Sequence, residues 1–130
     1  MTASLLGFVV EYNSRVCELF GHLHHAGTVD LTDAVLNARA GSHEQGAACS
    51  VRVVVSDGVI QVFRYQAYGC PHFLAACELL ASDLEGRRVT EITAWNWRAA
   101  EAELAVPAAK RARLLLLDEI VTQLSAVPVA

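Results

Sequence analysis

The residues best suited to chemistry stand together in the segment Tyr68-Gly69-Cys70-Pro71-His72. A strand-like run ends there, and a helix is predicted to begin at Pro71, because proline fits the first helical position, where its missing N–H is not needed. Cys70 is therefore expected at or beside the N-cap, where free backbone N–H groups and the helix dipole favour a thiolate. This corner predicts one reactive or ligating thiol.

Two further cysteines have a simpler, structural interpretation. Cys77 lies two helical turns after Cys70, about 10 Å along the helix axis, which is too far for the two sulfurs to share one ion. Cys77 falls on an apolar stripe, and Cys17 lies near one, as free cysteines in a core commonly do. Four cysteines in such a chain indicate reduced thiols rather than a disulfide scaffold, which favours a cytoplasmic location.

The histidines allow a chemical or a structural interpretation. His22, His24 and His25 come at the predicted end of the first helix, where a cation complements the helix dipole. His22 and His25 are three residues apart and could share a metal, although solvated histidines are commoner at a helix end. His72 stands in the first turn after Cys70, where it either assists ionisation of the thiol or is solvated.

The first part of the chain is predicted to hold one helix and one strand. Residues 5–10 are apolar and fit either a strand or a helix. Ser14 is the expected cap of a helix that runs to about His25. Residues 28–40 are predicted as a strand, and residues 41–47 as a loop.

The clearest local signal is a β-hairpin. Cys49–Val55 and Val59–Tyr68 are rich in β-branched residues, and Ser56-Asp57-Gly58 between them predicts a tight turn. Because side chains alternate along a strand, each strand is expected to place three residues on one face. These are Val51, Val53 and Val55 on the first strand, and Ile60, Val62 and Arg64 on the second.

The second half of the chain is predicted to be helical. The expected helices are Pro71 to about Glu85, a short turn from Thr90, Asn96 to Leu104, and Pro107 to about Ser125. Leu114 to Leu117 is apolar all round, so the last helix is either deeply buried or covered by another chain. Trp95 and Trp97 fit core packing or a partner surface. The order predicts a single domain over residues 1–130, an α+β fold with a three-stranded antiparallel sheet and helices packed on it.

Composition limits the classes of partner. Apolar residues make up 54% of the chain, against a usual ~45–50%, and charged residues only 18%. The excess indicates either an Ala- and Leu-rich core or an apolar patch for a protein partner or a second copy. The net charge of −4 argues against nucleic acid. No run reaches the ~18 apolar residues of a membrane span, and no basic residue precedes residues 5–10 as in a secretory signal.

From about Tyr12 to Leu124, the chain resembles the iron–sulfur cluster scaffold family of IscU and the N-terminal domain of NifU. The segment from Gly58 to Cys70 is similar to the family's second hairpin strand and second ligand cysteine. Pro71 to Gly86 is similar to the helix after that cysteine, and Leu115 to Leu124 to the final helix. The resemblance implies the family's fold and a pocket where three cysteines, helped by an aspartate and a histidine, hold a [2Fe–2S] cluster or zinc.

Only one of the ligands that the resemblance implies is present. The second ligand cysteine corresponds to Cys70. Counted back from the hairpin without gaps, the first cysteine corresponds to Gln45 and the aspartate to Ala47. The His-Cys pair that carries the third ligand corresponds to Arg111 and Ala112. The family's ligand pocket is therefore expected to hold no metal in this chain.

The family's chaperone signal, Leu-Pro-Pro-Val-Lys, corresponds to residues 105–109, where only Pro107 fits. A metal site could still have been rebuilt if Cys49 faces the pocket. Cys49, Cys70 and His43 would then gather around a cluster or zinc, both of which need four ligands, mostly thiolates or imidazoles.

Three functions follow from these residues. The first is a non-enzymatic, scaffold-like protein of iron–sulfur cluster assembly with a degenerate metal site. The second is an acceptor of sulfur as a persulfide, or a redox thiol, at Cys70, although no Cys-x-x-Cys partner is present. The third is a non-catalytic module that binds a protein partner or a second copy of itself. We expect the first, with the assembly machinery as partner.

Overall fold

The computed structural model describes residues 2–5, 8–30 and 36–126 of the 130-residue chain. It is an α+β fold built on a three-stranded antiparallel sheet, with the strands in the order β3-β4-β5. The strands are β3 (Leu36–Ser42), β4 (Ala47–Ser56) and β5 (Val59–Tyr68). The fold class expected from the sequence is therefore confirmed.

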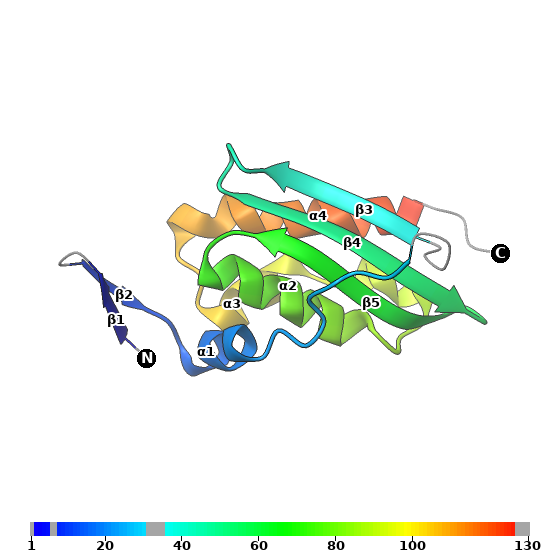
Figure 1. The fold of residues 1–130 in the computed structure, drawn as a ribbon, viewed down its shortest axis with the longest axis horizontal. Helices are drawn as coiled ribbons and strands as arrows, with labels where there is room; N and C mark the ends of the chain where they lie inside the picture. The colour runs from blue at the N-terminus through cyan, green and yellow to red at the C-terminus, as the bar shows by residue number, and fades with distance from the viewer. Residues whose placement is uncertain (1, 6–7, 31–35, 127–130) are drawn as a thin grey trace.

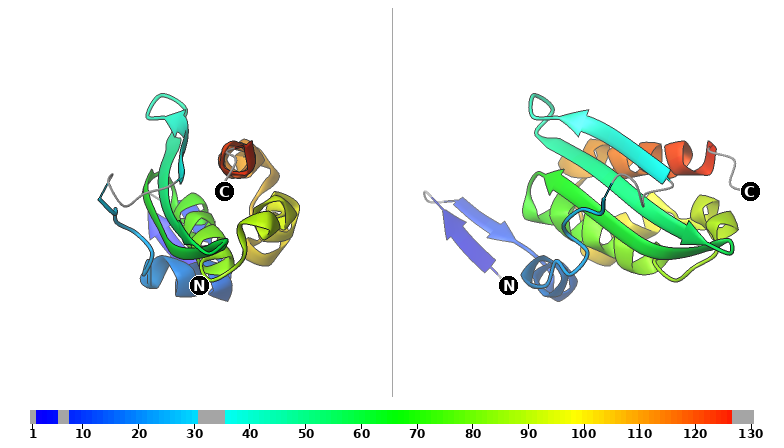
Figure 2. Two further views of the ribbon diagram at one scale, coloured as in Figure 1. Left: turned by 90° about the vertical axis from the view of Figure 1, so that its right-hand side faces the viewer. Right: turned by 45° about the vertical axis from the view of Figure 1, so that its right-hand side comes forward.

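Helices cover one face of this sheet (Figures 1 and 2). α2 packs against β5, α4 packs against β3, and the shorter helices lie around them. The helical elements are α1 (Ser14–Gly21), α2 (Pro71–Leu84), the 3₁₀ helix η1 (Val89–Ala94), α3 (Trp97–Leu104), the 3₁₀ helix η2 (Ala108–Lys110) and α4 (Arg111–Ala126). Among the residues with described coordinates, no helix is long and apolar enough to cross a bilayer.

The N-terminal residues form a separate hairpin of β1 (Thr2–Leu5) and β2 (Phe8–Glu11). This settles the ambiguity over residues 5–10 in favour of strands, except for residues 6 and 7, which lie outside the described residues. The hairpin projects from the body beyond α1 (Figure 1).

The predicted central hairpin is confirmed, with one error in its facing. Asp57 and Gly58 take φ angles of 53° and 75°, as a two-residue turn between twisted strands requires. A register shift between Val54 and Val55 then changes which residues of β5 face inward. Ile60, Phe63 and Tyr65 are buried, whereas Val62 and Arg64 are only partly so, and the predicted shared face of Ile60, Val62 and Arg64 is wrong.

Three predicted boundaries before this hairpin also need correction. α1 ends at Gly21 rather than near His25, and its N-cap is Asn13, whose side chain accepts a 2.9 Å hydrogen bond from the Val16 N–H. β3 begins at Leu36, so residues 28–30 are not strand, while residues 31–35 lie outside the described residues. The expected loop over 41–47 is shorter, because β3 reaches Ser42 and β4 begins at Ala47.

The last helix is amphipathic rather than buried all round. Leu114 and Leu117 are buried against the sheet and the other helices, but Leu115 is 45% exposed. The expectation that the last helix is deeply buried on all sides is therefore wrong. The other expectation, that another chain covers its exposed side, stays a prediction.

Candidate functional site at the end of the sheet

Cys70 stands where the sequence predicted it, at the corner between β5 and α2. It is the N-cap residue, with Pro71 as the first helical residue, and its thiol makes no capping hydrogen bond to the helix. The side chain is half-buried. Gly69 allows the tight corner, because a Cβ there would lie 2.8 Å from Cδ2 of Phe73. A partly accessible thiol therefore lies at an open helix N-terminus.

The turn between β3 and β4 holds the positions that correspond to the family's first cysteine and its aspartate. Gln45 is exposed at this turn, and its backbone N–H donates to the Ser42 carbonyl oxygen at 3.1 Å. Ala47 is fully buried at the start of β4. Gly46 lies beside Arg113 of α4, whose Nη2 would be 3.4 Å from a Cβ at Gly46. The turn thus meets the start of α4, as a shared ligand pocket would require.

The start of α4 carries one cation, Arg111, at the positions that the resemblance assigns to the third ligand pair. Arg111 Nε lies 2.5 Å from Oε2 of Glu101 and forms an ion pair with it, and Ala112 is exposed. The positive charge of Arg111 is therefore taken up by α3.

His72 is buried, not solvated as one interpretation expected. It is only 2% exposed, its Nδ1 lies 3.3 Å from Lys110 Nζ, and its ring packs against Tyr12 at a centroid distance of 4.8 Å. Burial, and then the neighbouring ammonium of Lys110, lower the pKa of His72. The ring is therefore neutral near pH 7, and its Nε2 has no hydrogen-bond partner among the described atoms.

The two other cysteines near this end belong to the core. Cys49 and Cys77 are both buried, on β4 and α2 respectively. Burial raises the pKa of the Cys77 thiol well above its usual range, and the neighbouring Cys49 adds to this. Cys77 is therefore a poor nucleophile and a poor ligand as it stands, and Cys49 is closed off from solvent.

The structure does not bring His43, Cys49 and Cys70 together. The His43 ring lies 4.2 Å from the ring of Tyr68, a residue that is 49% exposed. Cys49 pairs with Ala67, and since successive residues face opposite sides of a sheet, Cys49 points inward while Tyr68 and His43 lie outward. Within the described ranges, no three His, Cys, Asp or Glu side chains are grouped so that they could hold a metal ion.

The donor set at this end does not fit zinc or an iron–sulfur cluster. Cys70 supplies one thiolate, while an amide, a methyl group and a paired guanidinium occupy the other positions, at Gln45, Ala47 and Arg111. Both groups need about four ligands, mostly thiolate or imidazole.

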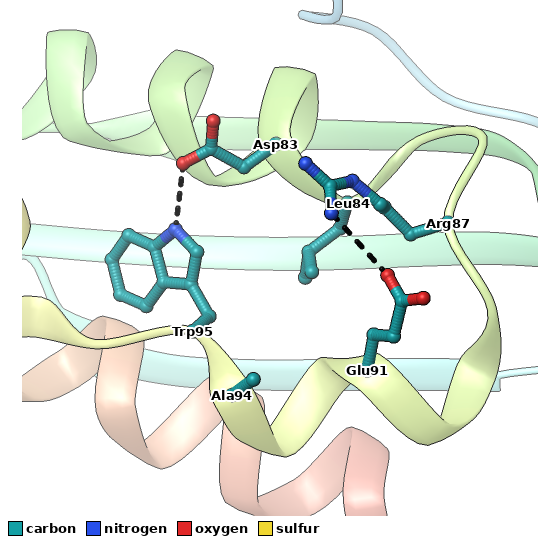
Figure 3. Close-up of a pocket in the computed structure, with 6 residues that line it drawn as sticks. All are labelled: Asp83, Leu84, Arg87, Glu91, Ala94 and Trp95. Atoms are coloured by element: carbon teal, nitrogen blue, oxygen red, sulfur yellow. Dashed lines mark hydrogen bonds and ion pairs between the residues drawn. The ribbon is translucent and has the colours of Figure 1, made fainter.

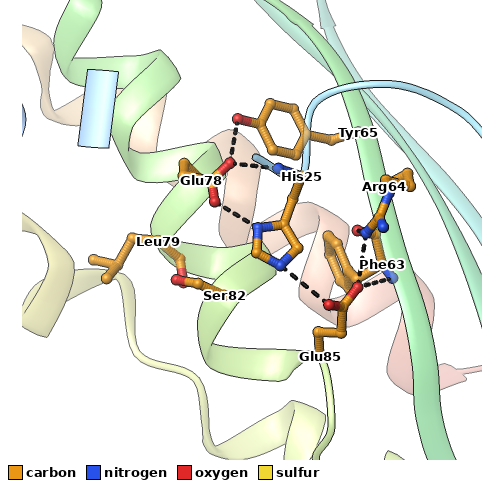
Figure 4. A network of polar contacts seen from close by, with 8 residues as sticks. All are labelled: His25, Phe63, Arg64, Tyr65, Glu78, Leu79, Ser82 and Glu85. Atoms are coloured by element: carbon orange, nitrogen blue, oxygen red, sulfur yellow. Dashed lines mark hydrogen bonds and ion pairs between the residues drawn. The ribbon is translucent and has the colours of Figure 1, made fainter. Parts of the chain in front are cut away.

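His22 is the C-cap residue of α1, whereas His25 lies beyond the helix end in a largely buried polar network (Figure 4). His25 lies between the carboxylate of Glu78 in α2 and that of Glu85, the C-cap residue of this helix, with Nδ1 2.5 Å from Oε2 of Glu78 and Nε2 3.2 Å from Oε1 of Glu85. Tyr65 also donates from its hydroxyl to Glu78 at 3.0 Å. His22 instead stacks on His24, while both ring nitrogens of His25 face carboxylates.

Sequence reasoning missed the role of Glu78. This carboxylate is 2% exposed, and the backbone N–H of His25 also donates to it at 3.0 Å. The only signal in the sequence is an acidic residue in the middle of an otherwise apolar helix. The network attaches the segment after α1 to α2 and β5.

A hollow of about 320 Å³ lies at the other end of α2, next to Trp95 (Figure 3). The indole N–H of Trp95 donates to Oδ2 of Asp83 at 3.1 Å, and burial raises the pKa of that carboxyl. Trp95 and Trp97 are both partly buried against the core. These contacts agree with the core-packing interpretation of the two tryptophans.

Comparison with known protein families identifies one that matches most of the chain. The sequence profile of the family described as "NifU-like N terminal domain" matches residues 11–126. No curated protein matches the chain significantly.

Two solved structures show the same fold. A putative iron–sulfur cluster assembly scaffold protein for the SUF system from Fervidobacterium islandicum AW-1 matches with a TM-score of 0.69 and 10% identity, over 87% of this chain and 96% of that one. A nitrogen-fixing NifU-like protein (N-terminal) from Brucella abortus matches with a TM-score of 0.64 and 21% identity, over 85% of this chain and 90% of that one. Since the family profile spans most of the sequence, this chain belongs to the NifU-like N-terminal domain family.

Proposed function

We propose that this protein works in iron–sulfur cluster assembly as a scaffold-like binding protein that itself carries no cluster or zinc. It is not an enzyme, acts in the cytoplasm, and serves through contacts with proteins of the assembly machinery. Membership of the NifU-like family supports the process. The donor set at the end of the sheet supports the loss of metal binding.

The observation that carries this proposal is the set of residues around Cys70. Gln45 is exposed in the turn, and Ala47 is fully buried at the position of the family's aspartate. Arg111 forms an ion pair with Glu101, which holds a cation where the third ligand pair would stand. One thiolate, with an amide, a methyl group and a paired guanidinium at the other ligand positions, is a poor site for a metal cation, because the cation would lack donor atoms.

Anaerobic reconstitution tests the proposal directly. The protein is incubated with ferrous iron and sulfide, and separately with zinc, then desalted and measured by absorbance and metal analysis. We expect a colourless product without stoichiometric metal. A product that retains an iron–sulfur chromophore or one zinc per chain, and loses it in Cys70→Ser, would contradict the proposal.

A variant that restores the family ligands supplies the matched control. Gln45→Cys, Ala47→Asp, Arg111→His and Ala112→Cys together would place a full ligand set around Cys70. We expect this variant to retain about one zinc per chain, since a site of four soft ligands binds zinc tightly. Adding Cys70→Ser to it should remove the zinc. Equal metal content in wild type and the restored variant would show that these positions do not decide binding.

A second candidate function is acceptance of sulfur at Cys70. Its support is the partly accessible thiol at an open helix N-terminus, a position at which reactive cysteines are commonly found. The thiolate would attack the outer sulfur of a donor persulfide, forming a Cys70 persulfide and releasing the donor's thiolate. Alkylation rates near neutral pH test it, with Cys17→Ser as the control. Rates that stay unchanged in Cys70→Ser would rule it out.

A further inference from the structure

The outward backbone groups on the two edge strands of the three-stranded sheet are hydrogen-bonded to very different degrees. On β5, the outward backbone groups at Ile60, Phe63 and Tyr65 have partners. The partners are the backbone of His25, Gly27, Gly86 and Arg87, and the carboxylate of Glu85. The segment after α1 and the chain after α2 therefore cover this edge between Ile60 and Tyr65.

On β3, a single side chain, that of Gln123, hydrogen-bonds to the outward backbone groups of Arg39. The N–H of Arg39 donates to Oε1 of Gln123 at 3.0 Å, and Nε2 of Gln123 donates to the carbonyl oxygen of Arg39 at 2.8 Å. A side-chain amide that donates and accepts in this way imitates one residue of a neighbouring strand. Because backbone groups alternate in direction along a strand, those of Asn37 also point outward. In the part of the chain that the structure describes, they have no partner.

The hairpin of β1 and β2 is itself not part of a larger sheet. Among the described residues, these strands pair with each other and make no substantial contact with another element. A two-stranded hairpin on its own is at best marginally stable in water, and residues 5–10 are apolar in sequence. The hairpin therefore needs a surface on which to complete its pairing.

In this structure the hairpin does not pair with β3 of its own chain, because the two belong to separate sheets. It joins α1 through Tyr12 and Asn13, and α1 lies on the β5 side of the sheet, away from the β3 edge (Figure 1). A second molecule offers the same unpaired hairpin to the β3 edge.

We propose that the chain self-associates by strand addition, with the β1–β2 hairpin of one copy pairing along β3 of another. Gln123 competes with the incoming strand for the backbone of Arg39, so it weakens the association and keeps it reversible. This use of an open strand edge explains why the hairpin stands away from the body (Figure 2).

Sedimentation of the full chain over a range of concentrations tests the proposal with two variants. Gln123→Ala removes both hydrogen bonds between these residues, whereas Arg39→Pro removes only the one that the Arg39 N–H donates. Only Gln123→Ala leaves the edge able to accept a strand, because proline removes the outward N–H of Arg39 without touching the bonds to β4. We expect Gln123→Ala to dimerise at least tenfold more tightly than wild type, and Arg39→Pro to remain monomeric.

Two further measurements complete the test. Val9→Pro in the Gln123→Ala background should abolish the dimer, since proline disrupts the hairpin strand. In wild type, hydrogen exchange at Arg39 and in residues 2–11 should slow as concentration rises, which also serves if Arg39→Pro does not fold. The proposal is overturned if both edge variants have the same oligomeric state, if the dimer survives Val9→Pro, or if exchange is independent of concentration.

Discussion

At the scale of single residues, Gly69 shows how closely the corner at Cys70 is built. A Cβ at this position would lie 2.8 Å from Cδ2 and 3.3 Å from Cβ of Phe73, which is itself buried in the first turn of α2. We expect Gly69→Ala to lower the free energy of unfolding by about 1–3 kcal/mol, because overpacking forces the helix or its Phe73 to shift. Gly21→Ala is the control, since nothing lies near its Cβ. Urea denaturation of both variants decides the matter, and equal midpoints would refute the packing argument.

The carboxyl group of Glu85 makes the stability of the fold depend on pH. Burial alone would raise its pKa, but hydrogen bonds from the Phe63 N–H and the Arg64 guanidinium, together with His25, lower it below the ordinary value of 4.5. A carboxyl whose pKa is lower in the folded state stabilises the fold above its unfolded pKa. That stability is lost as pH falls from about 4.5 through the folded pKa.

We therefore expect Glu85→Gln to flatten the acid side of the stability profile. The variant is less stable than wild type at neutral pH, and the difference narrows below about pH 4.5. Unfolding by urea at a series of pH values measures this. Glu91→Gln serves as control, because Glu91 forms only an exposed ion pair with Arg87. A difference between Glu85→Gln and wild type that is constant with pH would contradict the assignment.

At the scale of elements, α1 depends on its cap. Asn13 accepts a hydrogen bond from the Val16 N–H at 2.9 Å and donates through Nδ2 to the Glu103 carbonyl oxygen at 2.9 Å. Asn13→Ala is expected to lower the free energy of unfolding by about 1–2 kcal/mol, since it removes the cap and a link to α3. Ser14→Ala should change it by less than about 0.5 kcal/mol, because Ser14 is inside the helix. Thermal or urea unfolding compares the two, and a larger loss in Ser14→Ala would show that the sequence-based cap assignment was right.

α2 is the element on which the site and the polar network both depend. Its N-terminus carries Cys70, and its middle carries the buried Glu78 that holds His25 and Tyr65. Burial, followed by the nearby Glu78 carboxylate, raises the pKa of Tyr65, so its hydroxyl stays protonated and donates. The helix thus fixes the corner at one end and the segment after α1 along its length.

At the scale of the whole molecule, we expect folding to depend on packing rather than on a metal. The described core joins residues of all three central strands and of α1, α2, α3 and α4. We expect the melting temperature to stay within about 1 °C on addition of a chelator or of zinc, because only a ligand that binds the native state shifts it. The variant with restored ligands should instead melt higher with zinc. A wild type that melts lower after chelation would overturn both this expectation and the proposed loss of metal binding.

The sequence alone determined most of the local structure. The β4–β5 hairpin, the start of α2 at Pro71 and the helix capped by Asn96 all follow from short-range chemistry: a turn dipeptide, a proline at a first helical position, and a capping side chain. The resemblance to the scaffold family came from the order of these elements, and the family profile confirms it.

The tertiary structure decided features that the periodicity of the sequence does not predict. A register shift after Val54 changed which side of β5 is buried, and no residue type announces such a shift. The environments of His25 and His72 depend on residues distant in sequence, because Glu78 and Lys110 become their neighbours only when the helices pack. The inward direction of Cys49 depends on where the helices cover the sheet. Short-range chemistry fixes where an element begins, whereas burial and pairing depend on residues that only folding brings together.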